Sequence, residues 1–261
     1  DGGFGHGLEA DCLNPYSAPM QTWWAIQFLR EIDVPKDHPM IHKVLTYLAS
    51  GQNFVEDRWL NTTPENNNYP GAPWWGYSED SPTNKGYNPT IALAGFILKY
   101  GNPMSDLYDL ATSLVKEAAD FLIRTDELIE MHELGCFGEL AEYLAEASIE
   151  NLIDYEAYCQ KLNQQVFETI EHDISLWATS YCCRPSHYIR APKSLFYEKN
   201  KEVVHEELDL LISSINDDGV WDVTWQWGNY DKEFAISARW WQSNIAIQNI
   251  RMMKAFDKKT V

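Results

Sequence analysis

The sequence is short of basic residues, and this shortage limits the partners that the protein can have. Lysine and arginine number 20 against 39 aspartate and glutamate residues, which leaves a net charge of −19. A surface of this sign repels nucleic acids and anionic membranes. We therefore expect no nucleic-acid partner, and we interpret the excess of acids as an aid to solubility.

Cysteines are also few, and their number is odd. Of the five, Cys182 and Cys183 are adjacent, which is not the pattern of a disulfide framework and favours a reducing, cytoplasmic location. No zinc-ribbon spacing occurs, and the histidines and glutamates around His132, Glu139 and His187 have no recognised ligand spacing. The sequence therefore predicts no metal and no cofactor. It shows no signal peptide and no apolar run long enough for an integral membrane segment.

Strand signals are weak, whereas apolar residues recur at helical spacing through most of the chain. This periodicity predicts eight helices, at residues 17–31, 39–50, 88–101, 105–124, 137–148, 155–172, 195–215 and 235–255. A loop rich in asparagine, proline, glycine and tryptophan, at residues 52–87, separates the second helix from the third. Loops of this length usually serve a function in compact domains.

Glycine beside an aromatic ring recurs four times, before the first, third, fifth and eighth predicted helices. The motifs are residues 1–5, 71–76, 134–139 and 217–222. Glycine permits a sharp turn at positive φ, and the ring would fill the gap between helical hairpins, which stack because none buries both faces alone. The motifs thus predict inner helices around an axis, with their opening loops gathered at one end. Chance recurrence in a tryptophan-rich chain is the alternative.

Two of these motifs, Asp1–Gly5 and Ile215–Trp221, resemble the Gln-Trp repeats of the terpene cyclase and protein prenyltransferase superfamily. The resemblance implies an all-α fold, an α/α-toroid with a central apolar cavity. Residues 1–261 would form this single domain, and we expect a further helix upstream of Asp1. The Asp-x-Asp-Asp acid of the cyclases and the Asp-x-Cys pair of the prenyltransferases are absent, so the resemblance implies a fold without specifying a reaction.

The loop before the first helix is the first candidate site. It carries His6, Glu9 and Asp11 within six residues, and two carboxyl groups in different environments can serve as general acid and general base. We therefore predict these three as catalytic residues. The alternative is a cluster that only braces the loop.

A second set of candidates combines aromatic rings with acids, which suits a sugar or a cation. The predicted substrate-binding residues are Trp74, Trp75, Tyr77, Glu79 and Asp80 in the long loop, Trp24 on the first helix, and Trp225 and Trp227 before the last. The alternative for the long loop is that it packs on the helices as a lid and leaves its acids in water. The alternative for Trp225 and Trp227 is a packing role without a ligand.

Three classes of function follow from these patterns, and the sequence leaves open whether the protein is an enzyme. The first is acid or base chemistry on an isoprenoid or other small organic substrate in a cavity at the loop end of the inner helices. The second is a carbohydrate-active (α/α)-barrel, either a glycosidase or a polysaccharide lyase. The third is a non-catalytic binding scaffold. The expected partner is a small molecule or an oligosaccharide.

Overall fold

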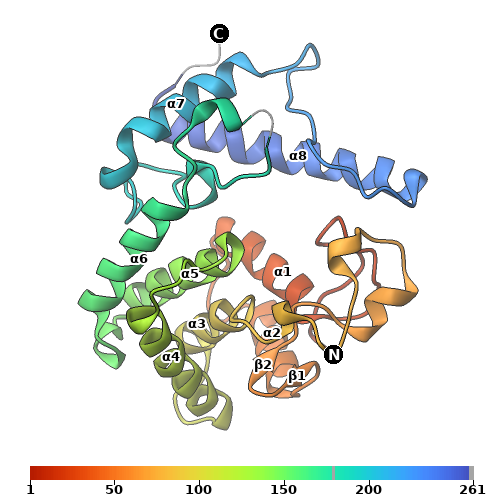
Figure 1. The fold of residues 1–261 in the computed structure, drawn as a ribbon. Helices are drawn as coiled ribbons and strands as arrows, with labels where there is room; N and C mark the ends of the chain where they lie inside the picture. The colour runs from red at the N-terminus through yellow and green to blue at the C-terminus, as the bar shows by residue number, and fades with distance from the viewer. Residues whose placement is uncertain (178–179, 259–261) are drawn as a thin grey trace.

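The computed structural model describes residues 1–177 and 180–258, and within them the chain is mainly α-helical, as the sequence predicts. The eight helices of this part are α1 (Pro19–Glu31), α2 (Pro39–Ala49), α3 (Thr90–Tyr100), α4 (Asp106–Arg124), α5 (Met131–Ala147), α6 (Tyr155–Thr169), α7 (Lys201–Ser213) and α8 (Asp231–Ala255) (Figure 1). The strands β1 (Phe54–Val55) and β2 (Arg58–Trp59) form one short antiparallel hairpin in the long loop. No helix of the described residues is both long and apolar enough to cross a membrane.

The core is densest around α3, which packs against α4 and α5. Nine of the eleven residues of α3 are buried, which is typical of a helix that is apolar on every side. Gly95 allows the close approach of α5, since a Cβ atom at this position would come within 2.6 Å of the Tyr143 ring. The consecutive helices α3 and α4 pack together, and so do α5 and α6.

The third glycine motif, residues 134–139, lies inside α5, so its predicted role as a turn is wrong. The helix begins at Met131, six residues before the predicted start, because the Glu130 carboxylate accepts hydrogen bonds from the backbone N–H groups of His132 and Glu133. Such a cap satisfies amides that have no partner within the helix. Gly135 and Gly138 instead lie where the rings of Tyr188 and Phe196 approach the helix.

Smaller differences affect the last two helices. The stretch predicted to open the seventh helix contains a 3₁₀ turn at Glu198–Asn200, and the α-helix itself begins at Lys201. α8 begins at Asp231, four residues earlier than its apolar pattern suggests. Its first turn carries Asp231 and Glu233, and acidic side chains are favourable near a helix N-terminus.

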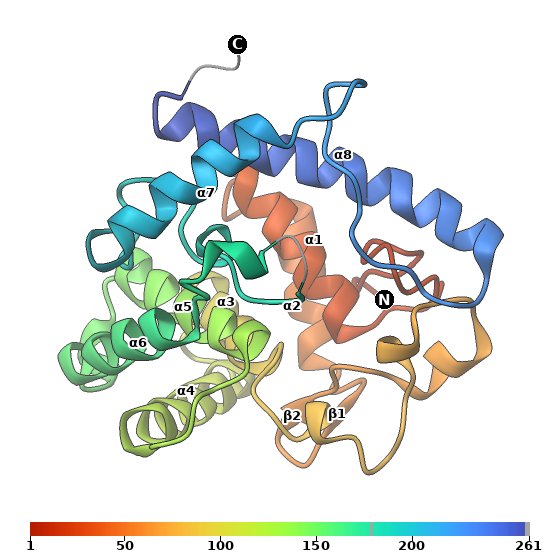
Figure 2. The ribbon, with the colours of Figure 1, turned by 45° about the horizontal axis from the view of Figure 1, so that its top comes forward.

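α7 and α8 lie on the opposite side of α1 from α2, α3 and α4 (Figures 1 and 2). α8 contacts α1 through Trp241, whose ring centroid is 5.6 Å from that of Trp24. Gln248 and Arg251 of the same helix bind the carboxylate of Glu31, each at 2.7 Å. These contacts bring the last helix of the chain against the first.

Candidate functional site

Three loops meet at the N-terminal end of α1. Cys12 forms a β-bridge with Gly71, the Leu13 N–H donates to the carbonyl of Pro70 at 3.0 Å, and the Ala72 N–H donates to the carbonyl of Asp11 at 2.8 Å. The first and second glycine motifs therefore belong to loops that lie side by side. The segment before α8 completes this group through its hydrogen bonds to Asp11.

Asp11 is buried, with 3% of its surface exposed, and its carboxylate accepts three hydrogen bonds. Trp225 Nε1 donates to Oδ2 at 2.9 Å, while Trp227 Nε1 and Ser237 Oγ donate to Oδ1 at 2.9 and 2.8 Å. Trp225 and Trp227, predicted to bind substrate, thus direct their N–H groups at a protein carboxylate. This geometry makes Asp11 a bracing residue that holds the segment before α8 against the first loop.

Glu9 lies behind Asp11 and is also 3% exposed. Its Oε2 accepts the backbone N–H of Asp11 at 3.0 Å, and its own N–H donates to Gln21 Oε1 at 2.7 Å. Burial, and then the negative charge of Asp11, raise the pKa of Glu9 well above its usual range. His6 differs from both acids, because it is exposed and its ring has no hydrogen-bond partner among the described residues.

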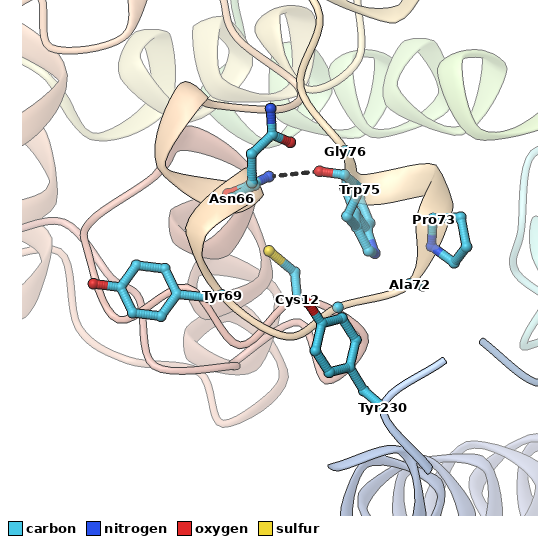
Figure 3. A pocket seen from close by; sticks show the side chains of 10 residues that line it. Cys12, Asn66, Tyr69, Ala72, Pro73, Trp75, Gly76 and Tyr230 are labelled. Carbon is cyan, nitrogen blue, oxygen red and sulfur yellow. Dashed lines mark hydrogen bonds between the residues drawn. The ribbon is translucent and has the colours of Figure 1, made fainter. Parts of the chain in front are cut away.

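A pocket of about 160 Å³ opens beside this cluster (Figure 3). It is lined by Cys12, Asn66, Asn67, Tyr69, Gly71, Ala72, Pro73, Trp75, Gly76 and Tyr230. Trp75, Tyr230 and Asn66 lie around Cys12 in Figure 3, and the ring of Tyr69 extends away from it. We call this pocket the loop-end pocket. Burial raises the pKa of Cys12 to about 11, so its sulfur is a neutral thiol at neutral pH.

Two asparagine side chains hold the wall of the loop-end pocket in place. Asn66 Nδ2 donates to the carbonyl of Trp75 at 3.0 Å. Asn67 accepts the N–H of Tyr77 at 2.8 Å and donates to the carbonyl of Tyr77 at 3.0 Å. An amide nitrogen has two N–H groups, and each asparagine keeps one that no described residue accepts. The indole N–H of Trp75 is buried and also has no partner among the described residues.

The structure brings only part of the predicted substrate-binding set to this pocket. Trp75 lines it, and Tyr77 braces its wall through Asn67. Trp74 is 51% exposed and is not part of the lining, and the same holds for the exposed acids Glu79 and Asp80.

Trp24 belongs to a row of four tryptophans between α1 and α8. The ring centroids of Trp23 and Trp24 are 5.3 Å apart, those of Trp24 and Trp241 5.6 Å, and those of Trp241 and Trp225 5.4 Å. All three contacts are edge-to-face, the arrangement that aromatic quadrupoles favour. Since Trp225 donates to Asp11, the row begins at the buried acid cluster.

The other end of the row reaches Glu139, which is not among the predicted site residues. Trp23 Nε1 and Gln27 Nε2 donate to Glu139 Oε2 at 3.1 and 2.9 Å. Burial raises the pKa of Glu139 to about 7, against the opposing charge of Arg30, yet the side chain stays 18% exposed. A partly exposed carboxyl group that titrates near neutrality can exchange protons with solvent or with a bound molecule.

The described residues contain no group of three or more His, Cys, Asp or Glu side chains placed to hold a metal ion. The fold and the site together define an all-α protein with a small pocket of aromatic rings and amides at the end of its first helix. No protein-family model, no curated protein and no solved structure matches the chain. The functional argument therefore depends on the geometry of the site.

Proposed function

We propose that the protein binds one ring of a saccharide in the loop-end pocket, on an α/α-toroid of the terpene cyclase and prenyltransferase type. The observation that carries the proposal is the lining, which combines the rings of Tyr69, Trp75 and Tyr230 with the side-chain amides of Asn66 and Asn67. Small-molecule sites combine aromatic surface with a few placed polar groups. A sugar ring can place its apolar face against the aromatic rings and its hydroxyl oxygens against the amide N–H groups.

The size of the pocket limits the ligand. Its volume of about 160 Å³ is below the ~300–1,000 Å³ typical of sites for drug-sized molecules. A single ring, such as the end unit of an oligosaccharide, is therefore the best match. The remaining units would extend over the exposed side of the loop, where Trp74 lies.

An isoprenoid suits this lining less well. A hydrocarbon chain would remove water from the N–H groups of Asn66, Asn67 and Trp75 without giving them acceptors. Each buried polar group left without a partner costs about 1–3 kcal/mol. Glu9 and Asp11 are not among the lining residues, so we propose binding as the function and assign these acids the task of holding the pocket wall from behind.

Titration with mono- and oligosaccharides, followed by calorimetry, tests the proposal. We expect Trp75→Ala to weaken saccharide binding at least about tenfold, which corresponds to ~1.4 kcal/mol. Trp74→Ala is the matched control, since it removes a neighbouring ring that does not line the pocket, and it should leave the affinity for a monosaccharide unchanged. Tight binding of a prenyl diphosphate in place of sugars, or equal effects of the two variants, would contradict the proposal.

A further inference from the structure

α8 is unusually poorly covered for a helix of its length. Of its 25 residues, only Ser237, Met252 and Met253 are buried. Four large apolar side chains of the helix are about half exposed: Ile236 at 52%, Trp240 at 48%, Ile247 at 54% and Ile250 at 50%. Most helical stability in proteins comes from packing an apolar face, and this helix leaves much of its apolar surface in solvent.

These four side chains share one face of the helix. They are spaced by four, seven and three residues, the pattern of core positions in a heptad repeat. Ser243 fills the missing position between Trp240 and Ile247. We call this row of exposed side chains, Ile236, Trp240, Ser243, Ile247 and Ile250, the α8 stripe. At 1.5 Å per residue it is about 20 Å long, enough for three turns of a partner helix.

Unpaired basic residues outnumber acidic ones beside the stripe, in a protein whose net charge is −19. Lys232, Arg239 and Lys254 are exposed and lie on or next to this face, and none of them forms an ion pair with a described residue. Arg251, by contrast, is paired with Glu31 at 2.7 Å. Of the acids in the first turn of α8, Asp231 is on the far side of the helix, whereas Glu233 lies three residues before Ile236 and seven before Trp240, at the edge of the stripe.

We propose that the α8 stripe docks an acidic amphipathic helix of a partner protein. The apolar side chains of the stripe would enter the groove between the partner's own apolar positions, in the helix-in-groove mode. Lys232 and Arg239, on one flank of the stripe, and Lys254, at its C-terminal end, would then pair with carboxylates of the partner. Such flanking pairs set the choice of partner and its orientation in coiled coils.

Charge also weighs against two other occupants. A second copy docked through the same stripe would bring the bases of both helices together, and like charges across an interface cost several kcal/mol. An anionic membrane would attract the three bases but repel the rest of a chain that carries 39 acids.

The test uses a synthetic acidic helix of about four heptads, with leucine at the a and d positions and glutamate at e and g. We expect the intact protein to bind this peptide, as measured by fluorescence anisotropy. The double variant Ile247→Glu/Ile250→Glu should bind at least about tenfold more weakly. Ile174→Glu is the matched control, because Ile174 is 49% exposed and lies outside the stripe, and it should bind as the unaltered protein does.

Three further experiments distinguish an acidic helix from the other possible partners of the α8 stripe. A peptide with lysine in place of glutamate should bind at least about tenfold more weakly than the acidic one, and equal binding would overturn the proposal. Sedimentation velocity of the protein alone, and pelleting with phosphatidylserine vesicles, should show a monomer and no lipid binding. Self-association or vesicle binding that the double variant abolishes would assign the stripe to a second copy or to a membrane and would overturn the partner helix.

Discussion

Asp11 ties together parts of the chain that are 214 to 226 residues apart in sequence. Its two oxygens receive all three hydrogen bonds that join the first loop to the segment before α8 and to Ser237. A buried carboxylate in such surroundings stabilises the fold only while its donors remain paired. At this residue, therefore, the first effect of a substitution should be on stability.

Asp11→Asn should lower the free energy of unfolding by about 1–3 kcal/mol. The asparagine oxygen can still accept from Trp227 and Ser237, but its NH₂ group would face the N–H of Trp225, and two donors cannot bond each other. Urea denaturation measures the difference. Asp37→Asn is the control, since Asp37 is exposed and its side chain forms no hydrogen bond with a described residue. Equal stability of the two variants would show that Asp11 does not brace the loops.

Glu139 should make stability depend on pH. Its folded-state pKa of about 7 is higher than the ordinary value of 4.5, so the folded protein holds the proton more tightly than the unfolded chain does. This contribution is fully present below about pH 4.5 and is lost as the pH rises through about 7. Relative to wild type, Glu139→Gln should therefore gain about 1–3 kcal/mol in stability between pH 5 and pH 8. Urea curves at both pH values measure this gain, and parallel pH profiles would contradict it.

At the residue scale, the sequence indicated some of the residues that lie in or beside the candidate site. Asp11 and Glu9 drew attention because they stand close together in a loop, and Trp75 because it stands in a long aromatic segment. Glu139 gave no local signal, since its partners Trp23 and Gln27 are more than a hundred residues away. Asn66 and Asn67 resemble ordinary loop residues until the loop closes and their side chains bind the carbonyls of Trp75 and Tyr77.

At the scale of elements, the fourth glycine motif fixes the connection between α7 and α8. Trp221 is 6% exposed, and its indole N–H donates to the carbonyl of Leu211 at 2.9 Å. Phe4, the equivalent ring of the first motif, is only half-buried and lines a hollow of about 270 Å³. The two rings therefore differ in how much they contribute to stability.

Trp221→Ala should destabilise the protein by about 3–5 kcal/mol, the usual cost of removing a large buried ring. Phe4→Ala should cost less than half as much, because solvent already reaches this ring. Thermal melts of both variants provide the comparison. A larger loss for Phe4→Ala would contradict the assignment of Trp221 as the buried ring of the α7–α8 connection.

The existence of all eight helices could be predicted from apolar periodicity, and six of them start within four residues of the prediction, while α5 and α7 each start six residues away from it. The start of α5 differs by six residues because the prediction treated residues 134–136 as part of a turn and began the helix at Phe137, whereas the Glu130 cap begins it at Met131. The 3₁₀ turn before α7 has no apolar pattern of its own. Such ends depend on capping and on tertiary contacts, which periodicity does not contain.

At the scale of the whole molecule, α8 depends on few contacts with the rest of the protein. The tryptophan row joins it to α1 through Trp241, Glu31 joins it through Gln248 and Arg251, and Asp11 joins it through Ser237. Met252 and Met253 are its buried apolar residues. A helix attached in this way should open more easily than α3, which is buried on nearly every side.

Trp241→Ala should therefore speed amide hydrogen exchange in α8 by about tenfold or more and leave exchange in α3 nearly unchanged. Trp240→Ala serves as the control, since its ring is 48% exposed and is not part of the row. Hydrogen–deuterium exchange mass spectrometry separates peptides from the two helices. A uniform increase across the chain would show that α8 unfolds only together with the core.

The long separation between Asp11 and its donors also has a consequence during synthesis. At about 5–20 residues per second, a ribosome needs roughly 10–40 s to make the 214 residues that separate Asp11 from Trp225. Throughout that interval the first loop has been translated while the indoles that bind its carboxylate have not. The nascent protein can assemble α3, α4 and α5 early, but the loop that carries Asp11 is not braced and the pocket is not closed until Trp225 and Tyr230 have been made.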